Sequence, residues 1–99
     1  MRSDPVVIRV WKGDERDVFA LFPADPADIY GQLCTSYEHV GQHAAADYDL
    51  CIRNSRPASE AEAADLTAEL RRIGYRPRVL KRASRRHHEK RLAVARGAA

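Results

Sequence analysis

The sequence lacks the long apolar runs and the glycine-rich signatures that identify several large classes of protein. No stretch approaches the roughly 18 consecutive apolar residues of a membrane helix, and the opening MRSDPVV carries no apolar signal core. We therefore expect a cytoplasmic protein with no membrane partner. The P-loop, the dinucleotide-binding GxGxxG and the GxSxG motif are absent, which argues against nucleotide use and serine-hydrolase chemistry.

Cysteine is also scarce. Cys34 and Cys51 do not form a CxxC pair, so a redox enzyme is not expected. In the cytoplasm both should be reduced, although opposed positions on paired strands would allow a disulfide. A Cys–His nucleophile built with His39 or His43 is a formal alternative without a recognisable signature around it.

The composition that is present describes a small globular protein. The chain has 99 residues, of which 44% are hydrophobic and 31% charged, and this size allows one domain with a modest core. Arginine outnumbers lysine 14 to 3 and there are 16 alanines, which indicates a GC-rich, bacterial gene.

Charge is divided unevenly along the chain. Residues 1–70 hold 6 Lys and Arg against 13 Asp and Glu, whereas residues 71–99 hold 11 against 1. Residues 71–99 therefore carry a net charge of +10, and residues 1–70, the body of the protein, carry a net charge of −7. This asymmetry predicts a basic tail that meets an anionic partner, folds back on the acidic body or is simply solvated.

Two alternating segments near the N-terminus predict a β-hairpin. They are VVIRVWK (6–12) and DVFALFP (17–23), separated by the turn-forming GDER. The following PADPAD predicts a loop, with Asp25 and Asp28 as turn formers rather than paired catalytic carboxylates. In the first strand Val6, Ile8 and Val10 should share one face, and Val7, Arg9 and Trp11 the other.

A second hairpin is predicted from residues 32–38 and 47–53, which also alternate. The loop between them would be 39–46. In this register Leu33 faces Ile52, Thr35 faces Leu50 and Tyr37 faces Tyr48 on one side, while Cys34 faces Cys51, Ser36 faces Asp49 and Glu38 faces Asp47 on the other.

Residues 59–75, SEAEAADLTAELRRIGY, predict an amphipathic helix. Ser59 and Glu62 form a capping-box pattern, and Gly74 should end the helix. Residues 76–82 follow as an edge strand, in which Pro77 and the basic residues protect the edge. The apolar stripe of the helix is Ala63, Leu66, Leu70 and Ile73.

These elements predict an α+β fold: a four- to five-stranded, mainly antiparallel sheet in the order β-β-β-β-α-β, with one amphipathic helix on one face. We expect a single domain over residues 1–82. Residues 83–99 have too little apolar surface to pack, so we expect a basic tail that is flexible or marginally helical.

The stretch YEHVGQHAAADYD (37–49) has the densest set of recognition-type side chains. His39, His43 and Asp47 stand four residues apart, a spacing that could hold zinc on a helix, but the predicted hairpin argues against that geometry. We therefore expect no metal and no other cofactor. The alternatives are a structural polar loop and a recognition patch of Tyr37, His39, Gln42, His43, Asp47 and Tyr48.

The segment KRASRRHHEKR (81–91) is the strongest charge signal. Such a segment binds phosphates without reading sequence, and it has no interleaved aromatic residues for base stacking. Its expected contacts to nucleic acid or to an acidic protein are Arg82, Arg85, Arg86, Lys90 and Arg91.

Three segments carry a resemblance. IRVWKGDERDVFALFPADPAD, SYEHVGQHAAADY and ASEAEAADLTAELRRIGYRPRV look like parts of small uncharacterised proteins of bacterial genomes and mobile elements, over about residues 6–80. The resemblance implies a context and no catalytic residues. Small proteins of that context often act as regulators, or as inhibitors of host or phage machinery.

Taken together, the sequence predicts a protein that binds or regulates without catalysis, through the hairpin end and the basic tail. The rival prediction is a small metal- or His-dependent enzyme that uses His39, His43 and Asp47. A third is a homodimer that pairs through an edge strand or an exposed helix face.

Overall fold

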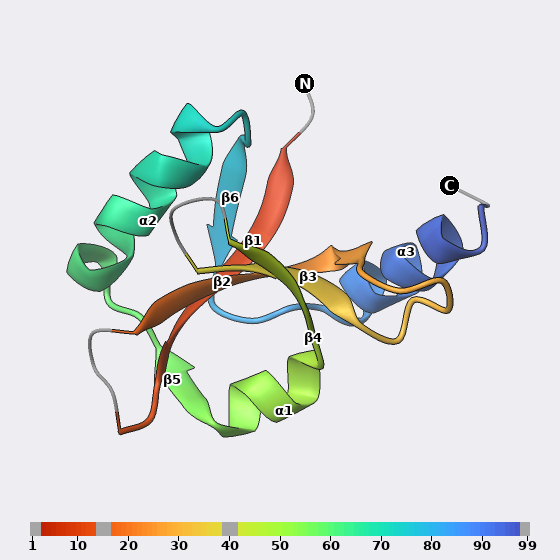
Figure 1. The fold of residues 1–99 in the computed structure, drawn as a ribbon, viewed down its shortest axis with the longest axis horizontal. Coiled ribbons are helices and arrows are strands. Elements are labelled where there is room, and N and C mark those ends of the chain that lie inside the picture. The colour runs from red at the N-terminus through yellow and green to blue at the C-terminus, as the bar shows by residue number, and fades with distance from the viewer. Residues whose placement is uncertain (1–2, 14–16, 39–41, 98–99) are drawn as a thin grey trace.

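The computed structural model describes residues 3–13, 17–38 and 42–97. Within these residues it has one six-stranded sheet with helices packed against both faces (Figure 1), which confirms the expected α+β class. The strands follow the order β4-β3-β2-β1-β5, and β6 also pairs with β1. They are β1 (Asp4–Trp11), β2 (Val18–Pro26), β3 (Cys34–Tyr37), β4 (His43–Ala46), β5 (Ser55–Pro57) and β6 (Pro77–Leu80), with helices α1 (Tyr48–Arg53), α2 (Glu60–Arg72) and α3 (Arg85–Ala95).

Strand β1 organises the sheet because three strands pair with it. Strand β2 pairs antiparallel along one edge, with Val7 opposite Leu21, which confirms the predicted first hairpin. The other edge is shared: β5 pairs antiparallel with residues 9–11, and β6 pairs parallel with residues 4–7. The last strand is therefore held by a contact across more than seventy residues of chain, beginning with Asp4 opposite Pro77.

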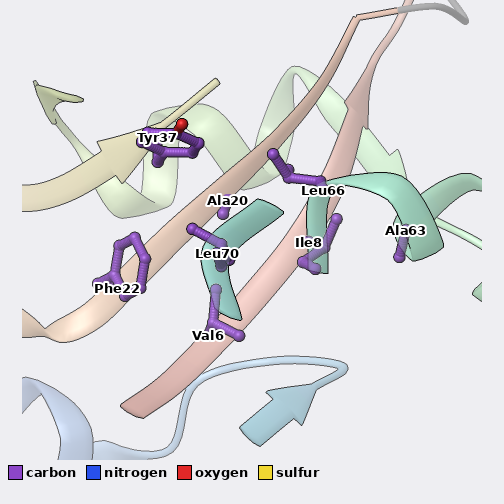
Figure 2. Packing of buried hydrophobic residues seen from close by; sticks show 8 residues of the cluster. All are labelled: Val6, Ile8, Ala20, Phe22, Tyr37, Ala63, Leu66 and Leu70. Carbon is purple, nitrogen blue, oxygen red and sulfur yellow. The ribbon is translucent and has the colours of Figure 1, made fainter. Parts of the chain in front are cut away.

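Helix α2 covers one face of the sheet. Its N-terminus has the expected capping box between Ser59 and Glu62, and its C-terminus ends at Gly74, whose φ of 115° is left-handed. Ile73 was expected in the buried stripe but is 48% exposed, because it is the C-cap residue at which the chain leaves the helix. Figure 2 shows the cluster beneath α2: Val6, Ile8, Ala20, Phe22, Tyr37, Ala63, Leu66 and Leu70.

The opposite face is covered by α1. Its side chains at 48, 51 and 52 pack with the residues of β1, β2 and β3 that alternate with the first cluster. Arg9 is buried among them, and its guanidinium donates to Ser55 Oγ (2.9 Å), Ser55 O (2.8 Å) and Ile52 O (3.1 Å). These bonds satisfy a buried cation with neutral acceptors and tie α1 and β5 to β1.

The second hairpin differs from the predicted one. Strand β3 pairs with β4, so that Tyr37 lies opposite His43, and the segment 47–53 is helix α1 instead of a strand. The predicted loop 39–46 therefore contains a strand in its second half. The predicted pairs are wrong: Leu33 with Ile52, Thr35 with Leu50, Tyr37 with Tyr48, Cys34 with Cys51, Ser36 with Asp49, and Glu38 with Asp47.

A helix cap explains the difference. Asp47 is the N-cap of α1, and its Oδ1 accepts the backbone N–H of Leu50 at 3.1 Å. Tyr48, Cys51 and Ile52 are spaced as i, i+3 and i+4, and all three pack against the core, whereas Leu50 is 48% exposed. The alternation that predicts a strand and this helical spacing coexist in the same six residues, and the cap favours the helix.

The segment after Ala83 is helical, which was one of the two expectations for it, but it packs against the sheet although its apolar surface was expected to be too small for packing. Residues 85–95 form helix α3, which packs against β2. The anchor is polar: Arg91 is only 8% exposed, and its guanidinium donates to Pro23 O and Gly31 O, both at 2.8 Å. Apolar content alone therefore underestimates how well this segment packs.

Replacement of Gly31 tests the docking of α3. Gly31 has a φ of 75°, and an added Cβ would lie 2.9 Å from Ala95 Cβ and 3.1 Å from Leu92 Cα. We expect Gly31→Ala to lower the free energy of unfolding by about 2–4 kcal/mol, from backbone strain and overpacking together. The measurement is chemical denaturation followed by circular dichroism.

The matched control is Gly13→Ala. Gly13 also has a positive φ, of 88°, but nothing lies within 4 Å of an added Cβ. Gly13→Ala should lower the free energy of unfolding by only about 1 kcal/mol, from backbone strain alone. Equal losses in the two variants would contradict the close approach of the 27–33 loop to α3.

Candidate functional site

The hairpin end contains a chain of polar contacts. Tyr37 is fully buried under α2, and its hydroxyl donates to the Glu69 carboxylate. The His43 ring packs 4.7 Å from the Tyr37 ring, between centroids, and its Nε2 lies 2.9 Å from the Tyr75 hydroxyl. Tyr75 in turn stacks on Phe22 with centroids 4.7 Å apart. These contacts hold β4 to α2 and to the turn that follows it.

Two surface hollows meet at Tyr75. One, of about 640 Å³, is lined by Asp4, His43, residues 73–74, Tyr75 and Arg76. The other, of about 600 Å³, lies between the start of β1, β2 and the side of α3 that carries Lys90. Burial first, and then the charges of Asp25 and Asp4 and the nearby Tyr37, raise the pKa of Tyr75. At neutral pH the phenol therefore stays protonated and does not act as a base.

The predicted recognition patch is not one surface. Tyr37 lies in the cluster under α2, and Tyr48 lies in the cluster on the opposite face, where its hydroxyl accepts the Ala83 N–H at 2.7 Å. Asp47 serves as a helix cap. Gln42 and His43 are exposed at the hairpin end. His39 lies outside the described residues.

The predicted metal trio is not assembled by the residues that can be placed. His43 Nε2 is engaged with Tyr75, and Asp47 Oδ1 with the backbone of α1. Across the described ranges 3–13, 17–38 and 42–97, no group of three or more His, Cys, Asp or Glu side chains is arranged to hold a metal ion.

Both cysteines are free thiols. Cys34 lies opposite Ala46, and burial, with smaller effects of its neighbours, raises the pKa of its thiol to about 11. Burial, and then the charge of Asp47, raises the pKa of the Cys51 thiol. A thiol becomes a nucleophile as its thiolate, so at neutral pH neither side chain is prepared for covalent catalysis.

The basic segment is ordered on two elements. Of the five cations predicted to meet a partner, Arg82, Arg86 and Lys90 are exposed without an ion pair among the described residues. Arg85 is exposed and pairs with Glu89 at 3.2 Å. Arg91 does not belong to this set, because it is buried and its guanidinium is used inside the protein.

Strand β6 adds a cation that the sequence analysis did not include. Arg78 is exposed on β6 and close enough to α3 for its charge to lower the pKa of His87, after the larger effect of burial. Only the pairing of β6 with β1 brings it there, although its place in the basic half of the chain was a signal. We define the basic surface as Arg78, Lys81, Arg82, Arg86 and Lys90.

Comparison with protein-family models, with curated proteins and with solved structures finds no match for this chain. Among the described residues, no helix combines the length and the apolar character needed to cross a membrane.

Acidification should loosen the docking of α3. Arg91 donates to His88 Nδ1 at 2.8 Å, so this nitrogen is unprotonated in the fold. Burial, followed by the charges of Arg91 and His87, lowers the pKa of His88 below 6.5, against an opposite effect of Asp49; the Tyr48 ring lies edge-on at 4.9 Å. A lowered pKa means that stability is complete above the unfolded value and is lost as pH falls through about 6.5.

We therefore expect the melting temperature to fall between about pH 7.5 and pH 5.5, and to fall less in His88→Asn, whose side-chain oxygen can accept from Arg91 but does not titrate. His87, whose pKa is also lowered, contributes in the same direction and remains in the variant. The measurement is thermal denaturation at both pH values; an identical fall in the two proteins would contradict the assignment to His88.

Proposed function

We propose that this protein acts by binding, and that the basic surface binds the phosphate backbone of nucleic acid. The observation that carries the proposal is the placement of cations on a docked helix. Arg86 and Lys90 are both exposed and stand one turn apart on α3, which Arg91 holds against β2. Cations held by a packed helix lose less side-chain and backbone freedom on binding than cations on a flexible tail.

The neighbouring charges support the same conclusion. Arg78 on β6, together with Lys81 and Arg82 in the connection to α3, extends the positive surface beyond the helix. Glu89, the one acidic side chain of residues 71–99, forms an ion pair with Arg85. A surface rich in positive charge attracts polyanions, and phosphate contacts release counterions, which makes such binding strongly dependent on salt.

The groups that could support catalysis favour binding as well. The thiols and the Tyr75 phenol are protonated at neutral pH, and His43 is engaged with that phenol. The hairpin end therefore serves the packing of β4 in this proposal, and the interaction with the partner belongs to β6 and α3.

Removal of two cations tests the proposal. We expect the protein to bind a short DNA at about 50 mM salt and to weaken markedly by about 200 mM. The double variant Arg86→Gln, Lys90→Gln should reduce the slope of log affinity against log salt by about 1.4–1.8, because each phosphate contact contributes roughly 0.7–0.9. The measurement is fluorescence anisotropy with labelled DNA across a salt series.

The control removes the same charge elsewhere. Lys12 and Arg53 are exposed and lie together at the far end of β1 from β6. Lys12→Gln, Arg53→Gln should leave the salt slope nearly unchanged. Absence of binding at low salt, equal effects of the two double variants, or equally tight binding to polyglutamate would each overturn the proposal.

A further inference from the structure

The loop between β2 and β3 displays two large apolar side chains that the basic surface does not include. Ile29 is 78% exposed and Tyr30 is 68% exposed, the highest values among the large hydrophobic residues that the structure describes. The Tyr30 ring has no hydrogen bond and no ring contact within the part of the chain that the structure describes. An aromatic side chain that is this exposed can stack with an aromatic ligand.

The loop that carries Tyr30 is held firmly from inside. Asp28 Oδ1 accepts the Leu33 N–H at 2.9 Å, and Asp28 O accepts the Gly31 N–H at 3.3 Å. Arg91 Nε donates to Gly31 O at 2.8 Å. The residue that follows Tyr30 is therefore fixed to α3 by a buried hydrogen bond, so that the ring projects from a supported backbone.

The same contact places Tyr30 beside the end of α3. The Cβ position of Gly31 lies 3.2 Å or less from atoms of Arg91, Leu92 and Ala95, in the last turns of the helix. The exposed cations of that helix are Arg85, which pairs with Glu89, Arg86 and Lys90, with Arg96 at its C-cap. An exposed aromatic ring and a set of cations thus lie on one helix and the loop packed against it.

We propose that the partner is single-stranded nucleic acid, with one base stacked on Tyr30 while its phosphates contact the cations of α3. This inference rests on the proposed function and specifies it. Surfaces that bind single strands combine a cationic track with aromatic rings, because every base has a face that can stack. The bases of an intact duplex already stack on one another, so they offer no free face on which Tyr30 could stack.

The charges favour this partner over a lipid surface. Ile29 and Tyr30 are only two side chains, and a stable interfacial anchor needs a longer apolar face or a second apolar anchor. The exposed cations, by contrast, are spread from the first turn of α3 (Arg85 and Arg86) through Lys90 to Arg96 at its C-cap, in keeping with successive phosphates of a strand.

The test separates the bases from the phosphates. The probes are an oligothymidylate of about a dozen nucleotides and an abasic strand of the same length, which has the same phosphates and no bases. We expect the wild-type protein to bind the oligothymidylate more tightly than the abasic strand. Tyr30→Ala should weaken binding of the oligothymidylate by about 5- to 150-fold and leave binding of the abasic strand nearly unaffected. Tyr30→Trp, which keeps an aromatic ring, should retain the wild-type affinity for the oligothymidylate.

Ile29→Ala is the matched control, since it removes an equally exposed neighbour that has no ring. It should leave both affinities unchanged. Equal wild-type binding of the two strands, or an unaltered Tyr30→Ala, would overturn the stacking role and leave phosphate binding in place. Loss of binding to anionic vesicles in both Ile29→Ala and Tyr30→Ala, with oligothymidylate binding intact, would assign the loop to lipid. A wild-type protein that binds neither strand at low salt would overturn the proposed function itself.

Discussion

The guanidinium of Arg91 joins α3 to β2 and to the loop after β2, which lie 60 to 68 residues away in the sequence. It lies 8% exposed between β2, the loop that follows β2, and α3, and it donates to the carbonyls of Pro23 and Gly31 and to His88 Nδ1. Each buried carbonyl that lost this donor would cost about 1–3 kcal/mol. Because α3 is short of apolar residues, these bonds decide whether the helix lies on the sheet, and therefore where its other cations point.

A cation buried without a carboxylate is costly unless neutral acceptors satisfy it, and the fold meets this requirement twice. Arg9 donates to Ser55 and to Ile52 O on the α1 side of the sheet, just as Arg91 donates to carbonyls beside α3. In the described residues no buried side-chain nitrogen or oxygen lacks a partner. The two arginines thus hold α1 with β5, and α3, to the sheet, whereas the cations of the basic surface are exposed.

Internal contacts also occupy the polar groups of the hairpin end. Tyr37, Tyr48 and His43 form hydrogen bonds within the protein. Their partners are Glu69, the Ala83 N–H and Tyr75, respectively. Tyr37, Tyr48 and His43 are the side chains that a search for recognition residues selects first, because they are clustered in the chain. The cations of residues 81–91 stand out in the sequence, whereas Tyr30 does not, since the 27–33 loop meets α3 only in the folded protein.

The sequence by itself determined the first hairpin, helix α2 with its capping box and glycine stop, the final strand and the α+β class, because alternation, helical spacing and caps are local properties. It also located the positive charge. The tertiary structure alone decided that residues 48–53 form a helix, since a two-residue and a helical period are both present there and Asp47 selects between them. The tertiary structure alone also decided that residues 85–95 pack against the sheet and that Arg91 is buried. The local sequence does not distinguish a buried arginine from an exposed one, and the carbonyls of Pro23 and Gly31 that bind Arg91 lie far away in the chain.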